Sequence, residues 1–456
     1  MEESIVKLLA GTAKVDITPN YGSPTRRWYL GADGGRITEI RWPLYARTLA
    51  LSDGETISTI TSMDIACIYK CHHDRIRELV REMSPVPIGN VILHNTHQHS
   101  DSFVEYEPAY DVFGINDVAF DMDYISGLAR RIASSVCLAA GAMEPVHVGS
   151  GCGAVEEGIA SCRRVLTQDG RLLWRSSRPS PELRALPRGH IDPRVGVISF
   201  TAPEGRPVAT LYNYACHPSA AGGDSPPVIS ADYPGFASHM IETCHGGTAL
   251  FLHGCTGDIN PAKYVRGDSL NFDDRIADAR RMGRILGAEV LKTLGTIETR
   301  EAGYLNVARR DCELPIKPEA ADVEGSLAAA HKAIEDWKRN GADPRTALRK
   351  YVIARKITAS GGCPVTMFAV AIDDDNMAFI PGEPFTAFGE EIKKAGGGGN
   401  TLVAATCGED PFYMPTGEAI EQGGYETGYI ASPETGERLV REATELLGSC
   451  ARRSGA

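Results

Sequence analysis

The chain has 456 residues with 47 basic and 59 acidic side chains, and its formal net charge is −12. Hydrophobic residues make up 43% and charged residues 23%, which excludes wholesale disorder, a collagen-like repeat and a coiled coil. A chain of this charge lacks the positive field that holds a phosphate backbone, so we expect no nucleic-acid partner.

The N-terminal residues carry no predicted targeting signal, because they begin with acidic side chains and reach a short apolar patch only at Ile5 to Ala10. The most apolar stretch elsewhere, around Val136 to Met143, is too short to span a bilayer, so we expect no stable membrane insertion. The 12 cysteines are scattered without a C-x-x-C pair, which favours reduced thiols and a cytoplasmic protein over a disulfide framework.

The first elements alternate between strand and helix patterns. A hairpin is predicted from Leu44 to Leu51 and from Thr56 to Ile65, because both runs are apolar and a turn at Asp53-Gly54 separates them. A helix is predicted over His73 to Met83, with its apolar residues on one face, and a strand over Val86 to Leu93.

Three later strands each run into a polar cluster, and α/β enzymes commonly place their chemistry at such strand ends. Val208 to Tyr214 leads to Cys216-His217-Pro218, Thr248 to Leu252 leads to the segment His253 to Pro261, and Met377 to Ile380 leads to Pro381-Gly382-Glu383.

Helices alternate with these strands, which predicts an α/β protein with mixed β-sheets and flanking helices. The amphipathic helices are expected over Asp273 to Leu294, Val323 to Lys338 and Glu434 to Leu447. Because no long linker interrupts the pattern, we predict a single large domain spanning residues 1–456. Segments 20–40, 104–122 and 261–272 are expected to be loops that rim a pocket.

His97-Gln98-His99 is the most suggestive local feature. On an extended segment an H-x-H pattern places both rings on one face, where they can bind one metal, or one can bind while the other handles protons. A pair of polar loop histidines is the alternative. Two further candidates, His217 and Glu383, each lie next to a proline. Each can be a ligand or base on a rigid backbone, or an ordinary polar group.

Other catalytic motifs are missing from the sequence. It contains no H-E-x-x-H, no P-loop and no G-x-S-x-G, and Gly149-x-Gly151-x-Gly153 has the wrong spacing for a dinucleotide loop. Asp232 has two interpretations, a base or partner of a metal histidine, and an N-cap of the helix that follows it.

Together these motifs resemble the neutral/alkaline non-lysosomal ceramidase family. The matches run in order along the chain: the segment Ala10 to Pro19, Thr96-His97-Gln98-His99-Ser100, Arg163-Arg164, Cys216-His217-Pro218, Gly257-Asp258-Ile259-Asn260-Pro261, Pro381-Gly382-Glu383, and Tyr413 followed by Tyr425.

The resemblance implies a catalytic zinc ion, Zn²⁺, with four ligands: His97, His217, Glu383 and Tyr413. It also places His99, Arg163 and Tyr425 in the site. In those roles His99 can shuttle protons, while Arg163 or Tyr425 can donate a hydrogen bond to a developing oxyanion.

The sequence departs from the family in two ways. Asn260 stands where the ceramidases carry a serine tied to activity, which favours zinc-activated water over a serine-dependent mechanism, with Asn260 orienting the substrate. The family also continues into a C-terminal immunoglobulin-like domain, which we do not expect here.

We therefore expect a zinc-dependent amidohydrolase that cleaves an amide or ester bond of a small, water-soluble N-acyl or O-acyl substrate. The sequence leaves two alternatives open: acyl transfer or ring closure on the same scaffold, and a non-catalytic metal-binding pseudo-enzyme. It does not determine the oligomeric state.

Overall fold

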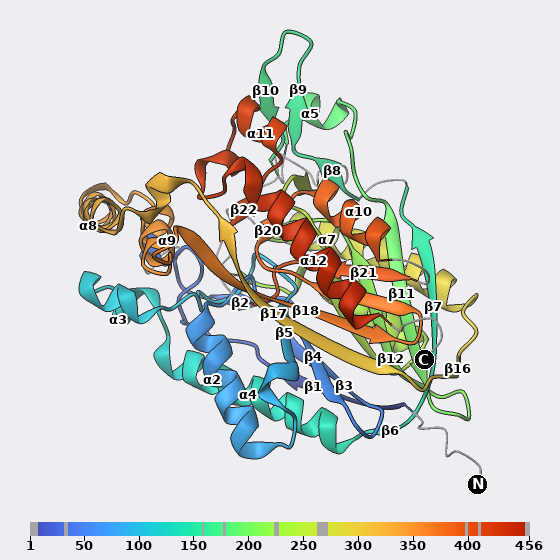
Figure 1. Ribbon diagram of the computed structural model, residues 1–456. Helices are drawn as coiled ribbons and strands as arrows, with labels where there is room; N and C mark the ends of the chain where they lie inside the picture. Colours follow the sequence, from blue (N-terminus) through green and yellow to red (C-terminus); the bar gives the residue numbers. More distant parts are fainter. Residues whose placement is uncertain are drawn as a thin grey trace.

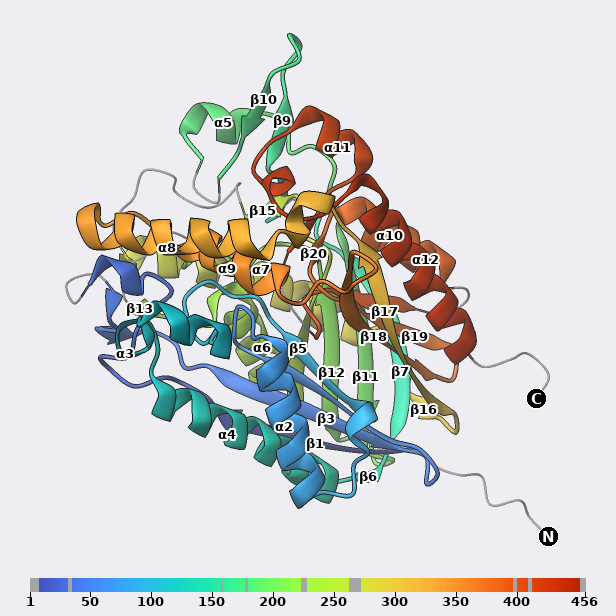
Figure 2. The same cartoon turned by 60° about the vertical axis from the view of Figure 1, so that its left-hand side comes forward.

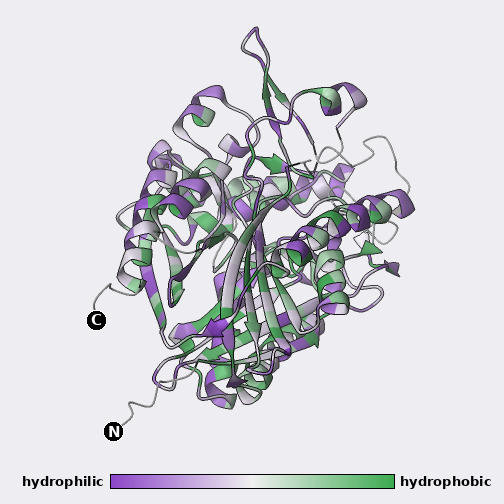
Figure 3. Cartoon of the chain, turned by 90° about the vertical axis from the view of Figure 1, so that its right-hand side faces the viewer, coloured by the Kyte–Doolittle hydropathy of each residue, from purple (hydrophilic) through white to green (hydrophobic). Residues whose placement is uncertain are grey.

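The computed structural model describes residues 8–31, 35–156, 159–176, 179–222, 228–261, 272–396, 400–408 and 412–451. Within these residues, three larger β-sheets each carry helices on one face (Figures 1 and 2). Figure 3 shows hydrophilic residues recurring along the outer helices.

The first sheet has the strand order β5-β4-β3-β1-β6. Its strands are β1 (Leu9–Asp16), β3 (Tyr45–Ser52), β4 (Ile57–Met63), β5 (Val91–Asn95) and β6 (Glu144–Pro145). Helices α2 (Lys70–Met83) and α4 (Met122–Gly141) pack together and cover one face of this sheet, because their apolar stripes join its core.

The second sheet has the strand order β14-β12-β11-β7-β16. Its strands are β7 (His147–Ala154), β11 (Arg194–Thr201), β12 (Pro207–Tyr214), β14 (Thr248–His253) and β16 (Arg300–Glu301). Helices α6 (Asp232–Cys244) and α7 (Phe272–Leu294) cover its outer face.

The third sheet has the strand order β17-β18-β19-β21. Its strands are β17 (Leu305–Pro315), β18 (Gly362–Ile372), β19 (Asp375–Phe379) and β21 (Thr401–Ala404), and helices α10 (Thr386–Ala395) and α12 (Pro433–Cys450) pack on it. The inner faces of all three sheets share one apolar core, to which Leu49, Phe200 and Phe379 each contribute a fully buried side chain.

Two-stranded ribbons and shorter helices complete the described part of the chain. The ribbons pair β2 (Glu39–Ile40) with β13 (Val228–Ile229), β8 (Ser161–Cys162) with β15 (Ile259–Asn260), β9 (Arg164–Leu166) with β10 (Leu172–Trp174), and β20 (Glu383–Pro384) with β22 (Tyr413–Met414). The remaining α-helices are α3 (Asn116–Ala119), α5 (Pro181–Ala185), α8 (Val323–Asn340), α9 (Arg345–Ala354) and α11 (Gly417–Gln422).

The predicted α/β class with mixed sheets and flanking helices is confirmed. The predicted hairpin is β3–β4, and Gly54 in its turn has a φ of 92°. The predicted strand from Val86 is wrong at its start: a 3₁₀ turn at Ile88–Asn90 precedes β5, which begins at Val91.

Among the described residues, no helix is long and apolar enough to cross a membrane. All 12 cysteines lie in the described part of the chain, and all are free thiols.

Candidate metal centre

The candidate site lies where parallel strand pairs of all three sheets end. These pairs are β4–β5 in the first sheet, β12–β14 in the second and β19–β21 in the third. Because His97 follows β5, His217 follows β12 and Glu383 follows β19, the three side chains reach one place from three sheets. The topology therefore brings together the polar clusters that follow these strands.

His97 has a left-handed φ of 63°, so the extended geometry predicted for the H-x-H segment is wrong. The rings of His97 and His99 nevertheless lie 5.1 Å apart between centroids. His97 Nδ1 lies 2.7 Å from the Ala66 carbonyl oxygen. Since a carbonyl only accepts, Nδ1 carries the proton and donates it, which leaves the Nε2 lone pair of His97 facing the site.

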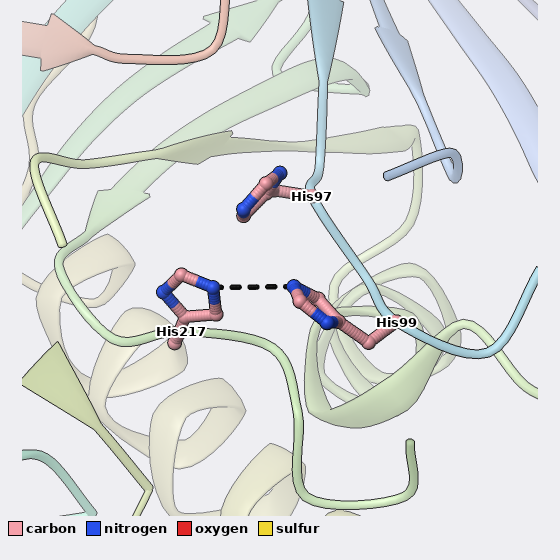
Figure 4. A group of neighbouring side chains, drawn as sticks. All are labelled: His97, His99 and His217. Carbon is pink, nitrogen blue, oxygen red and sulfur yellow. Dashed lines mark hydrogen bonds between the residues drawn. The ribbon is translucent and has the colours of Figure 1, made fainter. Parts of the chain in front are cut away.

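The His217 ring is oriented like that of His97, with Nδ1 toward a neighbouring oxygen and Nε2 toward the site. Its Nδ1 lies 3.2 Å from the hydroxyl of Thr256 and 3.4 Å from the Thr256 carbonyl, while its Nε2 faces His99 Nε2 at 3.1 Å. His97, His99 and His217 offer ring nitrogens that lie within 4.8 Å of one another. Figure 4 shows the three imidazoles gathered around one space. This buried group can hold a metal ion.

Glu383 adds a carboxylate to the same space. Its Oε2 lies 3.3 Å from His97 Nε2 and 3.7 Å from His217 Nε2. Burial by itself raises the pKa of Glu383, but electrostatic interactions with His97, His217 and Arg163 outweigh it and hold the pKa well below its usual range, so the carboxylate is ionised.

Two buried atoms here lack a hydrogen-bond partner among the described residues, His97 Nε2 and Glu383 Oε2. Buried polar atoms are nearly always satisfied, so a converging unsatisfied nitrogen and carboxylate oxygen fit a bound cation. Burial, and then the charges of neighbouring groups, lower the pKa values of His99 and His217 well below normal. Both are therefore neutral imidazoles, the form that binds metals.

Tyr413 lies beside Glu383, because β20 and β22 pair in parallel with these two residues in register. The Arg163 guanidinium lies over the Tyr413 ring, 4.7 Å from its centroid. Burial raises the pKa of the Tyr413 phenol well above normal, whereas Arg163 lowers it.

Arg163 is fixed in place on its other side. Its Nε donates to the carboxylate of Glu426 at 2.7 Å, and its terminal nitrogen donates to the Gly257 carbonyl. Arg164 binds the other oxygen of Glu426 at 2.8 Å. Sequence reasoning missed Glu426, which is fully buried and lies 263 residues from Arg163, so no local pattern marks the pair.

Tyr425 lies at the open side of the site. Its side chain is 51% exposed, and its hydroxyl shares a hydrogen bond of 2.9 Å with the hydroxyl of Tyr429. The exposed ring of Trp174, at the end of the β9–β10 ribbon, lies 5.9 Å from the ring of Tyr425. Sequence reasoning identified Tyr425 but missed Tyr429 and Trp174.

Asn260 is buried, and its side-chain amide donates to the Arg175 carbonyl at 2.9 Å. Its backbone pairs with Ser161 in the β15–β8 ribbon. The side chain therefore joins two segments of the site wall, and it does not bond the backbone of its own turn.

A cavity of about 420 Å³ brings the predicted residues together. All eight predicted site residues line it: His97, His99, Arg163, His217, Asn260, Glu383, Tyr413 and Tyr425. Of the three loops expected at its rim, segment 20–40 contributes Thr25, Arg26 and Arg27, and segment 104–122, which is described throughout, contributes none. Most of segment 261–272 lies outside the described residues.

Asp232 supports the loop that carries His217. Its carboxylate accepts the backbone N–H of Ala221 at 2.7 Å and that of Gly222 at 3.4 Å. Asp232 is the first residue of α6 and has a φ of 52°, whereas the N-cap position belongs to Ala231. Asp232 lies outside the described lining of the cavity, and its Oδ1 accepts the Tyr233 N–H at 2.6 Å.

His253, also missed as a site residue, lies behind the metal-binding group. Its ring is 5.2 Å from that of His97, and its Nε2 lies 3.0 Å from the Thr256 hydroxyl, which also contacts His217. Burial lowers the pKa of His253 well below normal, so it remains neutral. The sequence feature that could have identified His253 is its position at the end of a predicted strand.

Fold and site together define a mixed α/β protein with a buried histidine group that can hold a metal ion. The structure matches that of neutral ceramidase from Pseudomonas aeruginosa with a TM-score of 0.72 and 18% sequence identity, over 99% of this chain and 76% of the ceramidase chain. A second solved structure, described as ceramidase complexed with C2, matches with a TM-score of 0.71 and 18% identity, over 99% of this chain and 77% of that one.

The resemblance to the neutral ceramidases is therefore confirmed at the level of the fold. No protein-family model matches the sequence, and no curated protein matches it significantly.

Proposed function

We propose that this protein is a zinc-dependent hydrolase that cleaves an amide or ester bond in a small N-acyl or O-acyl substrate. The observation that carries the proposal is the convergence of His97 Nε2, His217 Nε2 and the ionised Glu383 carboxylate in one buried space. The fold shared with neutral ceramidase supports it.

The donor set suits zinc better than a harder cation. Two imidazoles and one carboxylate are typical ligands of catalytic zinc, and Tyr413 is the fourth ligand that the family resemblance implies. When bound, zinc polarises a carbonyl and lowers the pKa of its coordinated water to about 7, which supplies hydroxide at neutral pH.

The remaining residues have separate tasks in this proposal. Neutral His99 accepts a proton and returns it to the leaving amine or alcohol, since its Nε2 faces the same space as His217 Nε2. Tyr425 donates a hydrogen bond from its hydroxyl to the oxyanion, and Arg163, fixed by Glu426, adds positive charge beside Tyr413. Asn260 orients the substrate from the wall.

Hydrolysis is preferred over acyl transfer or ring closure because the cavity has an exposed edge. Tyr425 and Trp174 border the cavity and are 51% and 44% exposed, so water reaches the site. An enzyme that transfers acyl groups must exclude water from its site.

A panel of N-acyl and O-acyl substrates tests the proposal with the wild type and three variants, each assayed after exposure to zinc. We expect turnover by the wild type and by His190→Ala, a control histidine whose side chain is 64% exposed. Glu383→Gln keeps the shape but removes the charge, and we expect it and His97→Ala to lose turnover. A folded, zinc-loaded wild type that turns over no member of the panel contradicts the proposal and favours a binding module.

A further inference from the structure

The cavity is rich in arginine although the chain as a whole is acidic. The described lining contains six arginines against three carboxylates, Asp101, Asp343 and Glu383, in a chain of net charge −12. The arginines are Arg26, Arg27, Arg163, Arg275, Arg345 and Arg349. A positive cavity on a negative protein concentrates anions at the site.

Arg26 and Arg349 form a pair around one buried carboxylate. Arg26 lies 2.6 Å from one oxygen of Glu105 and Arg349 lies 2.8 Å from the other. Burial raises the pKa of Glu105, but the two arginines lower it to about 2, so this carboxylate is ionised. The single negative charge of Glu105 is therefore paired with the two positive charges of Arg26 and Arg349.

Donors remain on both guanidinium groups after these contacts. Each guanidinium has five N–H donors, and the described contacts with Glu105 involve one terminal nitrogen of each arginine. Asp101 is the other acid near Arg26, but it lies 4.0 Å away and its Oδ2 accepts the Ala66 N–H. The side chains of Arg26 and Arg349 are 14% and 17% exposed, so both are accessible from the cavity.

This pair lies close to the metal-binding group. Asp101 and Glu105 follow His99 on the same segment, and Arg26 and Arg349 line the same cavity as His99 and His217. The lining is also poor in aliphatic side chains, with Val228 the only one among the described residues. Such a wall suits a polar ligand better than lipid chains.

We propose that the substrate is a carboxylate-bearing amide or ester, such as an N-acyl amino acid, whose carboxylate is bound by Arg26 and Arg349. This inference rests on the proposed hydrolase function. Arginine forks bind carboxylates through two parallel hydrogen bonds, and the scissile carbonyl then extends toward His97 and His217.

Calorimetric binding to the metal-free protein tests the carboxylate site without interference from zinc. The probes are the N-acetyl derivatives of glycine, leucine, phenylalanine and glutamate, each compared with its neutral carboxamide. We expect at least one acid to bind about tenfold or more tightly than its amide, since charge-assisted hydrogen bonds are the stronger ones.

Arg349→Gln should abolish this preference. Arg206→Gln is the matched control and should keep it, because Arg206 also forms an ion pair with a glutamate, at 2.6 Å from Glu144, but lies outside the described cavity lining. Equal affinity within every pair, no binding of any probe, or an unchanged preference in a folded Arg349→Gln would overturn the inference. If Arg349→Gln does not fold, the wild-type comparison of acid with amide decides alone.

Turnover separates this inference from the proposed function. A zinc-loaded wild type that cleaves neutral amides as well as acids supports hydrolysis and contradicts carboxylate recognition. Preferential binding of the acids without any cleavage supports carboxylate recognition and contradicts the hydrolase.

Discussion

His97 and His99 are two residues apart, but the structure gives them different surroundings. His97 donates from Nδ1 to Ala66 and lies 3.3 Å from Glu383, whereas His99 has its described side-chain hydrogen bond with His217. Zinc binding therefore depends more on His97 in our account, and proton transfer depends on His99.

Substitution of each histidine by alanine separates the two roles. His99→Ala should keep its zinc and lose about 10²–10⁴-fold in turnover, the usual contribution of a general acid or base. His97→Ala should lose both. The measurement is zinc content and turnover of the same purified samples, and a His99→Ala protein without zinc would make His99 a ligand instead.

Asn260 is predicted to act on the substrate and also to hold the wall of the site. Asn260→Ala removes the hydrogen bond to the Arg175 carbonyl, so we expect lower stability. Because the variant also loses a side-chain donor to the substrate, we expect turnover to fall by about 10²–10³-fold, the usual cost of losing one oxyanion donor. Asn260→Ser should recover part of the turnover, because its hydroxyl also donates. Turnover per zinc-loaded folded molecule is the measurement, and wild-type values in both variants would contradict a catalytic role.

At the scale of elements, the sequence identifies where strands end but not which ion pairs connect the segments around those ends. The polar clusters after β5, β12 and β19 are recognisable because buried apolar runs stop abruptly before histidine, proline and glycine. The Arg163–Glu426 and Arg26–Glu105 pairs are not predictable, since only the folded topology brings such distant residues together. The left-handed φ of His97 is likewise set by tertiary contacts.

Gly257 links the β14–β15 turn to the segment that carries Glu383. A Cβ at this position would overlap the Glu383 carbonyl oxygen and lie 2.9 Å from the Phe385 ring. Gly257→Ala should therefore displace Glu383, with a cost of about 1–3 kcal/mol in the free energy of unfolding and weaker zinc binding.

Denaturant unfolding and zinc titration measure both effects of Gly257→Ala. Gly89→Ala is the control, because a Cβ there meets open space. Wild-type stability and zinc affinity in Gly257→Ala would show that the segment of Glu383 is not held by this close approach.

At the scale of the whole molecule, three sheets meet at the site, and an ion bound by their strand-end side chains would join them. The candidate ligands His97, His217 and Glu383 follow strands of the first, second and third sheets. The α/β class and the order of most elements are predictable from hydrophobic periodicity, whereas the packing of three sheets around one core is not, because apolar runs do not specify which faces meet.

A ligand that binds only the folded state stabilises it, by about 2.7 kcal/mol when its concentration is 100 times its Kd. We therefore expect a chelator to lower the melting temperature of the purified protein and added zinc to restore it. His97→Ala should show neither shift, while His190→Ala should show both. Identical melting curves of the wild type with chelator and with zinc would mean that no ion links the sheets.

The most direct test of the central claim is the zinc content of the purified, folded protein after exposure to zinc and removal of the excess. We predict about one zinc ion per wild-type chain, as in a mononuclear catalytic site, and much less in His97→Ala, His217→Ala and Glu383→Gln. A folded wild type that retains no zinc, or variants that retain as much as the wild type, would contradict it.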